Sequence, residues 1–584
     1  MAASSGYPAL AELKGRDFLS STNSIQVQRG VGTSSNGSGA FGATVNLLTN
    51  EVQDKAYATL SNSIGSYNTS KNTFKAGSGL INGRYTFDVR LSSLKSDGYV
   101  DRASSNLQSF YVSAASITAN ASLRLNVFSG KEKTYQSWYG ITEEQLTTDR
   151  KFNSAGTDKA GDPYENETDN YTQTHYQLFY NNKFNSKWSF NGALFATAGN
   201  GYYEQYKADQ KYSSYGLKNP IVNGIAITKT DLIRQLWLDN LYYGTNFSFQ
   251  MKDENREIIL GGGNSQYDGN HFGKIIWAQS GIFKDHRWYD LDAQKSEQHV
   301  FGKWMEKLGS FHLFGDLQLR NVNYAIEGFR NNPTLSIDKH WLFVNPKAGL
   351  RYTSGEYSSF ISYALANKEP NRDDFEAGTT DIPKHETLHD VEAGIERTGS
   401  KLKMAATVYH MRYNNQLVLT GKINDVGAYT RTNIPLSYRT GLEIEATLSI
   451  SDRLHINNNL ALSSNKVKNH REFYDDYDAG DQKVDFFSTS NIAFSPAVVD
   501  NATISYTLLK DLDQFPVCYT RSLAAARQWL RTQRRAGERA GLLASSNALR
   551  LKPEGLHVKA PVDVCHWFLN GNDDVRSSNA LEDA

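Results

Sequence analysis

The feature that most constrains the fold is a strict alternation of apolar and polar side chains that recurs along the chain. The segments with this pattern include residues 84–91, 402–408, 442–450 and 502–508. A period of two places the apolar side chains on one face and the polar ones on the other, as in antiparallel β-strands. The pattern predicts an all-β protein. One possibility is a soluble sandwich or propeller with an apolar core, and another is a transmembrane barrel with its apolar faces on lipid.

The predicted connections between these strands favour the barrel. Short polar turns are predicted at residues 252–256, 307–310, 397–401 and 451–453. Longer loops of about twenty to forty residues are predicted at 133–172, 200–236, 266–296, 326–344, 367–385, 413–436 and 466–498. Short turns at one end and long loops at the other are typical of outer-membrane barrels. We therefore predict a transmembrane antiparallel β-barrel with roughly eighteen strands between about residues 55 and 509.

A glycine-rich stretch, GSGAFG at residues 37–42, matches the G-x-G-x-x-G pattern of dinucleotide-binding sites. That site needs a helix directly after the glycines, with its N-terminus facing the pyrophosphate. The residues that follow, 43–49, are rich in β-branched side chains and lack a helical stripe. The stretch instead predicts a strand at residues 25–29, a turn-forming glycine loop and a second strand.

Composition excludes several other classes of protein. Lysine plus arginine and aspartate plus glutamate each number 62, so net charge gives no reason to expect a nucleic-acid partner for the barrel. No apolar run approaches the ~18 residues of a transmembrane helix. The first residues lack the basic start and apolar centre of a secretory signal. Two cysteines, Cys518 and Cys565, predict neither a disulfide framework nor a zinc site.

Several stretches resemble TonB-dependent outer-membrane receptors of Bacteroidetes-type bacteria, in the siderophore-like branch. They are RGVGTSSNGSGAFGATVNLLT (29–49), GYYEQYK (201–207), ALANKEPNRDDF (364–375) and NNQLVLTGKINDVGAYTRTNIPLSYRTGLEIE (414–445). The resemblance covers about residues 17–512. It implies that residues 17–52 are the C-terminal part of a plug domain and that residues 53–512 are an incomplete barrel, with about 18 of an expected 22 strands. Residues 1–16 stay unassigned.

The resemblance also implies a function. Receptors of this family take up scarce solutes, and the siderophore-like branch favours a ferric siderophore; glycans, cobalamin and haem are the alternatives. The implied partners are outer-membrane lipid and an energy-transducing TonB complex, although the chain shows no TonB box. We expect a monomer in the bacterial outer membrane that is not an enzyme and has no catalytic residues and no cofactor.

Candidate site residues fall into two groups. Arg29, Gly30, Gly37, Gly39 and Gly42 are expected to pack the plug against the barrel wall. The candidate ligand contacts are Tyr202, Tyr203, Tyr206, His271, Phe272 and Trp277. These aromatic side chains could stack on a siderophore or a sugar, or they could form an aromatic girdle at the membrane interface. His271 without a partner, and the acidic run 475–478 in a solvated loop, do not lead us to predict a metal site.

Residues 513–584 differ from the preceding sequence in amino-acid composition, and they are expected to form a small α/β segment. They resemble part of the Schlafen-like DNA/RNA helicase family at ERAGLLASS, at WFL (567–569) and at DDVRSS (573–578). Residues 522–531 predict an amphipathic helix and residues 541–546 a buried strand. No Gly-Lys pair is followed by the Ser or Thr of a phosphate-binding P-loop, so an ATPase fragment is the weaker functional alternative.

This change of composition at about residue 512 predicts that the barrel lacks its last strands. Unpaired strand edges in hydrocarbon cost several kcal/mol per backbone group. We therefore expect a receptor fragment joined to a helicase fragment, inactive as a transporter, in preference to a genuine fusion.

Overall fold

The computed structural model describes residues 21–37, 40–49, 52–282, 286–376, 382–423, 429–476, 481–492, 495–506 and 515–523. Within them lie a strand hairpin, a large barrel, one short α-helix and three 3-10 turns. The hairpin is β1 (Thr22–Arg29) and β2 (Ala43–Thr49), and the helical pieces are η2 (Ser34–Asn36), α2 (Gln145–Thr148), η3 (Tyr212–Tyr215) and η4 (Asp373–Phe375). No helix of this described part is long and apolar enough to cross a membrane.

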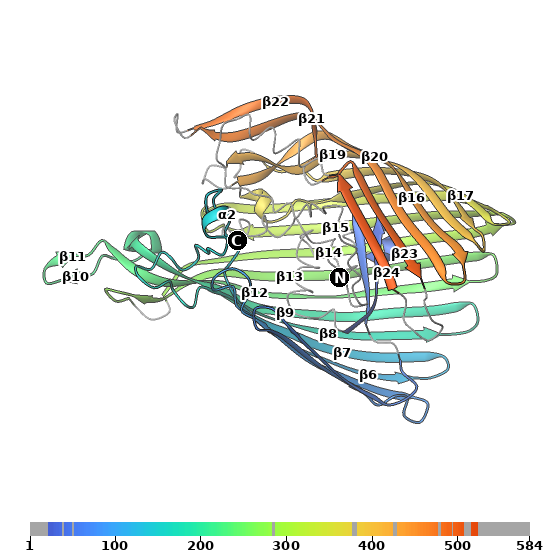
Figure 1. The fold of residues 1–584 in the computed structure, drawn as a ribbon, viewed down its shortest axis with the longest axis horizontal. Coiled ribbons are helices and arrows are strands. Elements are labelled where there is room, and N and C mark those ends of the chain that lie inside the picture. The colour runs from blue at the N-terminus through green and yellow to red at the C-terminus, as the bar shows by residue number, and fades with distance from the viewer. Residues whose placement is uncertain are drawn as a thin grey trace.

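Twenty of the described strands form one closed antiparallel barrel (Figure 1). The first seven are β3 (Tyr57–Gly65), β4 (Thr69–Gly77), β5 (Tyr85–Ser96), β6 (Ser105–Ile117), β7 (Ala121–Tyr135), β8 (Thr168–Lys183) and β9 (Trp188–Lys211). The next seven are β12 (Lys229–Lys252), β13 (Arg256–Ala278), β14 (His286–Leu308), β15 (Phe311–Glu327), β16 (Ser336–Ser354), β17 (Tyr357–Lys368) and β18 (Glu386–Thr398). The last six are β19 (Leu402–Ile423), β20 (Tyr429–Ser451), β21 (Leu454–Asp476), β22 (Asp481–Asn491), β23 (Val498–Tyr506) and β24 (Phe515–Leu523). A small hairpin of β10 (Ile221–Val222) and β11 (Ile225–Ala226) lies outside the ring.

The apolar faces of the strands point outward, which confirms the barrel and excludes the soluble sandwich. In β5, Phe87 and Leu91 are 54% and 53% exposed, whereas Asp88 and Arg90 between them are 5% and 2% exposed. A soluble sandwich would show the opposite arrangement, with the apolar side chains buried between sheets. Burying the polar side chains and exposing the apolar ones is the arrangement of a barrel whose solvent is lipid.

The four short turns are confirmed, but most long loops are shorter than predicted. Strands β9, β12 and β13 continue well past the lipid, so the connection predicted at 266–296 shrinks to residues 279–285. Beyond the membrane both faces of a strand carry polar and aromatic side chains. The two-residue period therefore fades from the sequence although the backbone pairing continues.

The barrel also reaches further along the chain than predicted. Residues 515–523 form β24, which pairs with β23 and takes its place in the ring beside β3. The described ring holds twenty strands, close to the predicted number of roughly eighteen, and β24 covers the edge of β23 along its length. The sequence FPVCYTRSL does alternate, and pairing it satisfies the backbone groups that an open edge would leave in hydrocarbon. The predicted helix loses its first two residues to β24, and its remainder, with the segment 541–546, lies outside the described residues.

A charged side chain on the outward face should destabilise the barrel. Leu317 of β15 is 48% exposed and lies about midway along the outward apolar face of its strand. We expect Leu317→Arg to lower the free energy of unfolding by about 2–4 kcal/mol, because the guanidinium would sit near the lipid midplane. Urea titration in bilayers, followed by heat-modifiable gel migration, measures this. Thr407→Arg, on the lumen face of β19, is the control, and an equal loss in both variants would contradict the assignment of faces.

Candidate functional site

The hairpin of β1 and β2 is fixed to the inner barrel wall just after β1. Arg29 forms an ion pair with Glu443 of β20. The backbone N–H of Val31 donates to Asp390 Oδ2 of β18 over 3.3 Å. Between them Gly30 has a φ of +72°, and a Cβ there would lie 2.7 Å from Asp390 Oδ2. Only glycine fits this conformation and this close approach without strain.

A second contact fixes the turn η2. The backbone N–H of Ser34 donates to Asp316 Oδ2 over 2.9 Å. Lys347 Nζ donates to the Ser34 hydroxyl over 2.8 Å and lies 3.7 Å from Asp316 Oδ2. The wall contacts predicted for Arg29 and Gly30 are thus present in the structure. Gly37 adopts a φ of +95° at the end of η2, and Gly39 lies outside the described residues.

Gly30 and Gly42 provide a matched test of the wall contact. We expect Gly30→Ala to loosen the hairpin by about 1–2 kcal/mol or more, because a left-handed backbone penalises a Cβ and Asp390 blocks the space. A Cβ on Gly42 would meet nothing within 4 Å, so Gly42→Ala should have little effect. The rate of proteolytic cleavage within residues 21–49 reports the loosening. Equal cleavage rates in the two variants would show that the contact at Gly30 is not fixed.

Above the hairpin, a buried ionic group crosses the inner wall. Arg320 Nη2 donates to Glu297 Oε2 over 2.9 Å and lies 3.3 Å from both carboxylate oxygens of Glu369. Lys295 Nζ lies 2.6 Å from Glu369 Oε1. Each of these side chains is less than a tenth exposed. A buried pair of this kind keeps its charges only because each charge has its partner.

Glu369 lies in the connection that follows β17. Burial alone would raise the pKa of this carboxyl group. The charges of Lys295 and Arg320 outweigh burial and lower the pKa from 4.5 to about 2. The folded state therefore binds fewer protons than the unfolded state between these values. The stabilisation is complete above about pH 4.5 and is lost as the pH falls through 2.

This ionic group predicts an acid-dependent stability. We expect Glu369→Gln to destabilise the barrel by about 3–5 kcal/mol at pH 7, because it leaves two buried cations short of a partner. Wild type should lose thermal stability between pH 4.5 and 2, and the variant should lose less. The exposed pair of Arg351 and Glu396 is the control, since Glu396→Gln should cost no more than about 1 kcal/mol. Equal effects of the two substitutions would contradict the buried pair.

Two connections fold into the barrel mouth above this group. Residues 328–335 and 369–376 pack against the inner faces of β14, β15 and β16 through an apolar cluster. The cluster is Ala293, Tyr324, Ile326, Phe329, Leu335, Ile337 and Phe375. Asp374 is held by Arg431 of β20 in a bidentate pair with distances of 2.7 and 2.6 Å. The two connections are therefore fixed parts of the mouth.

The inner face of β9, β12, β13 and β14 presents a group of aromatic and basic side chains at this mouth. Tyr203, Leu236, Gly273 and Tyr289 form one row in register. A Cβ on Gly273 would lie 2.5 Å from Tyr289 Cε1, so the tyrosine ring lies over the bare glycine. His271 faces the same side two residues earlier along β13.

Three arginines surround this row. Arg234 of β12 donates to Gln205 Oε1 over 2.7 Å, and Arg330 and Arg372 come from the two inward connections. The charges of all three arginines act on Tyr289, and that of Arg372 acts on His271. We name the six residues Tyr203, Arg234, His271, Tyr289, Arg330 and Arg372 the mouth cluster.

The other predicted contacts lie on the opposite face of the sheet. Tyr202, Trp237 and Phe272 stack along the outer face, with ring centroids 4.5 and 5.6 Å apart. Tyr206 stacks on Trp277 at 6.2 Å. The structure thus divides the six predicted residues, with Tyr203 and His271 inside and the other four outside.

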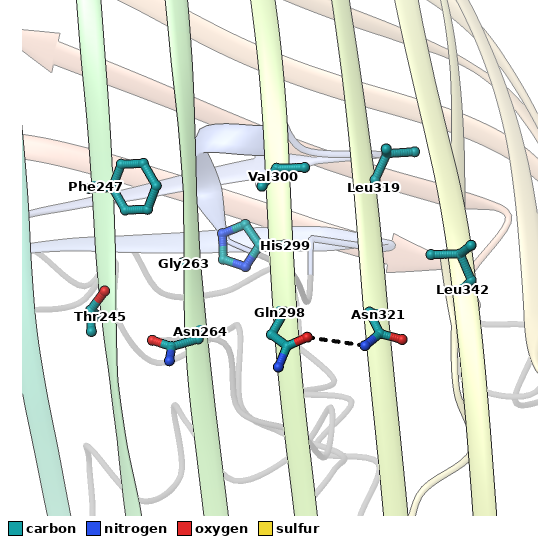
Figure 2. Close-up of a pocket in the computed structure, with 10 residues that line it drawn as sticks. All are labelled: Thr245, Phe247, Gly263, Asn264, Gln298, His299, Val300, Leu319, Asn321 and Leu342. Carbon is teal, nitrogen blue, oxygen red and sulfur yellow. Dashed lines mark hydrogen bonds between the residues drawn. The ribbon is translucent and has the colours of Figure 1, made fainter.

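The outer aromatic residues lie further along their strands than the rows drawn in Figure 2, and their role as a girdle or as ligand contacts stays a prediction. In Figure 2, Phe247, Val300 and Leu319 lie on β12, β14 and β15, and beside them run Thr245, Asn264, Gln298 and Asn321, with Leu342 of β16 in register with Asn321. Phe272 lies eight residues beyond Asn264 on β13, or about 26 Å at ~3.3 Å per residue. The depression in Figure 2, about 480 Å³, opens on this outer wall and is not part of the mouth.

Sequence reasoning missed four members of the mouth cluster. Arg372 lies within the ALANKEPNRDDF run, whereas Arg234, Tyr289 and Arg330 lie in stretches predicted as loops. A loop prediction gives no facing direction, so no signal in the sequence could separate them from other loop residues. In the described part of the acidic run, Asp475 accepts from Gln482, and Asp476 pairs with Lys483. The described residues contain no group of three side chains suited to a metal ion.

Comparison with solved structures decides the fold. The siderophore receptor PiuA from Acinetobacter baumannii is 12% identical, with 86% of this chain and 77% of that chain covered and a TM-score of 0.62. The ferric-catecholate import receptor Fiu from Escherichia coli K12 is 13% identical, with 86% and 76% covered and a TM-score of 0.60. The chain has the fold of a TonB-dependent receptor barrel.

A third structure with this TonB-dependent receptor fold is the alcaligin outer-membrane receptor FauA from Bordetella pertussis. It is 13% identical, with 86% and 74% covered and a TM-score of 0.56. No family model and no curated protein matches the chain. The solved structures are receptors and transporters, in agreement with the prediction of a protein that is not an enzyme.

Proposed function

We propose that the chain is an outer-membrane receptor that takes up an anionic ferric siderophore by TonB-dependent transport. The mouth cluster carries this proposal. Tyr203, Arg234, His271 and Tyr289 lie on the inner face of β9, β12, β13 and β14, and Arg330 and Arg372 of the inward connections lie near enough for their charges to act on Tyr289. Guanidinium groups suit the charged oxygens of catecholate or carboxylate ligands, and tyrosine rings suit their flat faces.

The likeness to PiuA, Fiu and FauA supports uptake of iron complexes in preference to glycans, cobalamin or haem. One structural neighbour is a copper transporter, OprC, so a chelated copper ion is a second candidate. The mouth cluster favours the ferric siderophore because its arginines would repel a free cation. A single histidine without a second soft ligand would also bind copper only weakly.

The remaining expectations about partners are part of this proposal. They are a surrounding outer membrane, a TonB complex that supplies the work of release, and a monomeric receptor. The expectation of an inactive chain stays a prediction; it rested on unpaired barrel edges, and the pairing of β24 with β23 weakens that support. Residues 515–523 of the expected Schlafen-like tail belong to the barrel as β24, and the rest of that tail, 524–584, lies outside the described residues.

Charge removal at the mouth tests the proposal. We expect Arg330→Gln with Arg372→Gln to weaken binding of an anionic ferric catecholate at least tenfold, because two charge-assisted contacts are lost at about 1.4 kcal/mol or more in total. Fluorescence quenching of the purified full chain measures the affinity. A neutral ferric hydroxamate should lose much less.

Arg287→Gln is the matched control, because Arg287 lies two residues from Tyr289 but covers Phe272 on the outer face. The Arg287→Gln variant should bind the ferric catecholate with the same affinity as wild type. Equal weakening by the outer and inner substitutions, or no weakening by either, would contradict the mouth cluster as the binding site.

A further inference from the structure

A basic patch lies on the outer wall at β19, β20 and β21, directly beyond the apolar rows. Val408, Leu442 and Leu462 form the last apolar row, and Val408 and Leu462 are 55% and 39% exposed. The next row holds His410, Thr440 and Ser464, and the row after that holds Arg412, Tyr438 and Lys466. Lys468 follows two residues along β21. We name His410, Arg412, Lys466 and Lys468 the outer basic patch.

The cations of the outer basic patch meet neutral groups. Lys468 Nζ donates to Thr489 Oγ1 over 2.8 Å and lies 6.0 Å from the Tyr438 ring centroid. Lys466 Nζ donates to Asn491 Oδ1. His410 shares a hydrogen bond of 2.7 Å with Thr440 Oγ1, and Arg412 is exposed. Within the part of the chain that the structure describes, none of the four forms an ion pair with a carboxylate.

The wall formed by β12 to β15 carries uncharged side chains in the matching row. There the row beyond the apolar face holds Thr245, Asn264, Gln298 and Asn321, with Gln298 and Asn321 hydrogen-bonded over 3.1 Å (Figure 2). The outward positions further along bear acids, among them Asp268 and Asp292. A cation on the outward face of that wall, Arg287, is paired with Asp290 over 2.7 Å, whereas the four cations of the outer basic patch have no carboxylate partner among the described residues.

We propose that the outer basic patch binds the phosphate of a phosphorylated lipid in the surrounding leaflet. The patch faces lipid and begins one row above the apolar wall, which is where lipid phosphates lie. Acyl chains would cover Val408, Leu442 and Leu462 while the phosphate meets Arg412, Lys466 and Lys468. The Arg412 guanidinium can hold a phosphate through two parallel hydrogen bonds. Free phosphate lacks the chains that the adjoining apolar rows accommodate.

Lipid retention tests this site independently of siderophore binding. The full chain would be reconstituted in bilayers that mix a zwitterionic lipid with lipid A, and then extracted, and retained lipid A counted by native mass spectrometry. Wild type should retain lipid A, and dephosphorylated lipid A should not be retained. Arg412→Gln with Lys466→Gln should weaken retention about 25-fold, at roughly fivefold for each cation. Inorganic phosphate should not displace the lipid.

The control removes two cations from periplasmic turns, Lys307→Gln with Lys401→Gln, and should retain lipid A as wild type does. Heat-modifiable migration confirms that every variant is folded. Equal retention by the patch variant and wild type would overturn the proposal. So would displacement by inorganic phosphate, which would assign the patch to a free anion, or equal retention of dephosphorylated lipid. Loss of siderophore binding with retention of lipid A would count against the proposed function alone.

Discussion

The structure depends on one constraint: every backbone N–H and C=O group that faces hydrocarbon must be hydrogen-bonded within the protein. A sheet meets this requirement only by closing on itself, and the described strands do so from β3 to β24. Closure explains why residues 515–523 join the ring although the sequence changes texture near residue 512. It also fixes which way each side chain faces. Once the outward positions are apolar, the lumen must receive the polar ones, and Thr86, Asp88 and Arg90 are accordingly buried.

The lumen is organised in levels that follow from this alternation. Carboxylates on β15, β18 and β20 hold the hairpin of β1 and β2 through backbone N–H groups and Arg29. Above them the pair of Arg320 and Glu369 ties one inward connection to the wall. That connection and its neighbour then carry Arg372 and Arg330 to the mouth. The side chains of the mouth cluster therefore stand on rigid supports, which under the proposed function would lower the entropy lost when a ligand binds. On the outer side, the cations of the outer basic patch on β19 and β21 lack carboxylate partners among the described residues, whereas Arg287 of β14 is paired with Asp290.

How far the sequence could predict this arrangement differs between levels. The all-β class, the four short turns and the strand after the glycine loop followed from the two-residue period and from turn chemistry. The continuation of the strands beyond the membrane could not be predicted, because side chains that face water on both sides of a strand need not alternate between apolar and polar. The division of Tyr202 from Tyr203, and of Phe272 from His271, needed only the alternation of a strand, yet both pairs were predicted to lie in loops. Arg330 and Arg372 reach the mouth through apolar contacts made by Phe329 and Phe375, which connect parts of the chain far apart in sequence.

The most direct test of the central claim is the solvent that each face of one strand meets. Nitroxide labels placed singly at residues 404–409 of β19, with both native cysteines replaced by serine, would be measured in bilayers by power saturation with oxygen and with a water-soluble nickel complex. The account predicts a two-residue period in which labels at Met404, Ala406 and Val408 are relaxed mainly by oxygen, and those between them mainly by nickel. A reversed period, or labels at 404, 406 and 408 that neither reagent reaches, would place the apolar face inside a protein core and contradict the account.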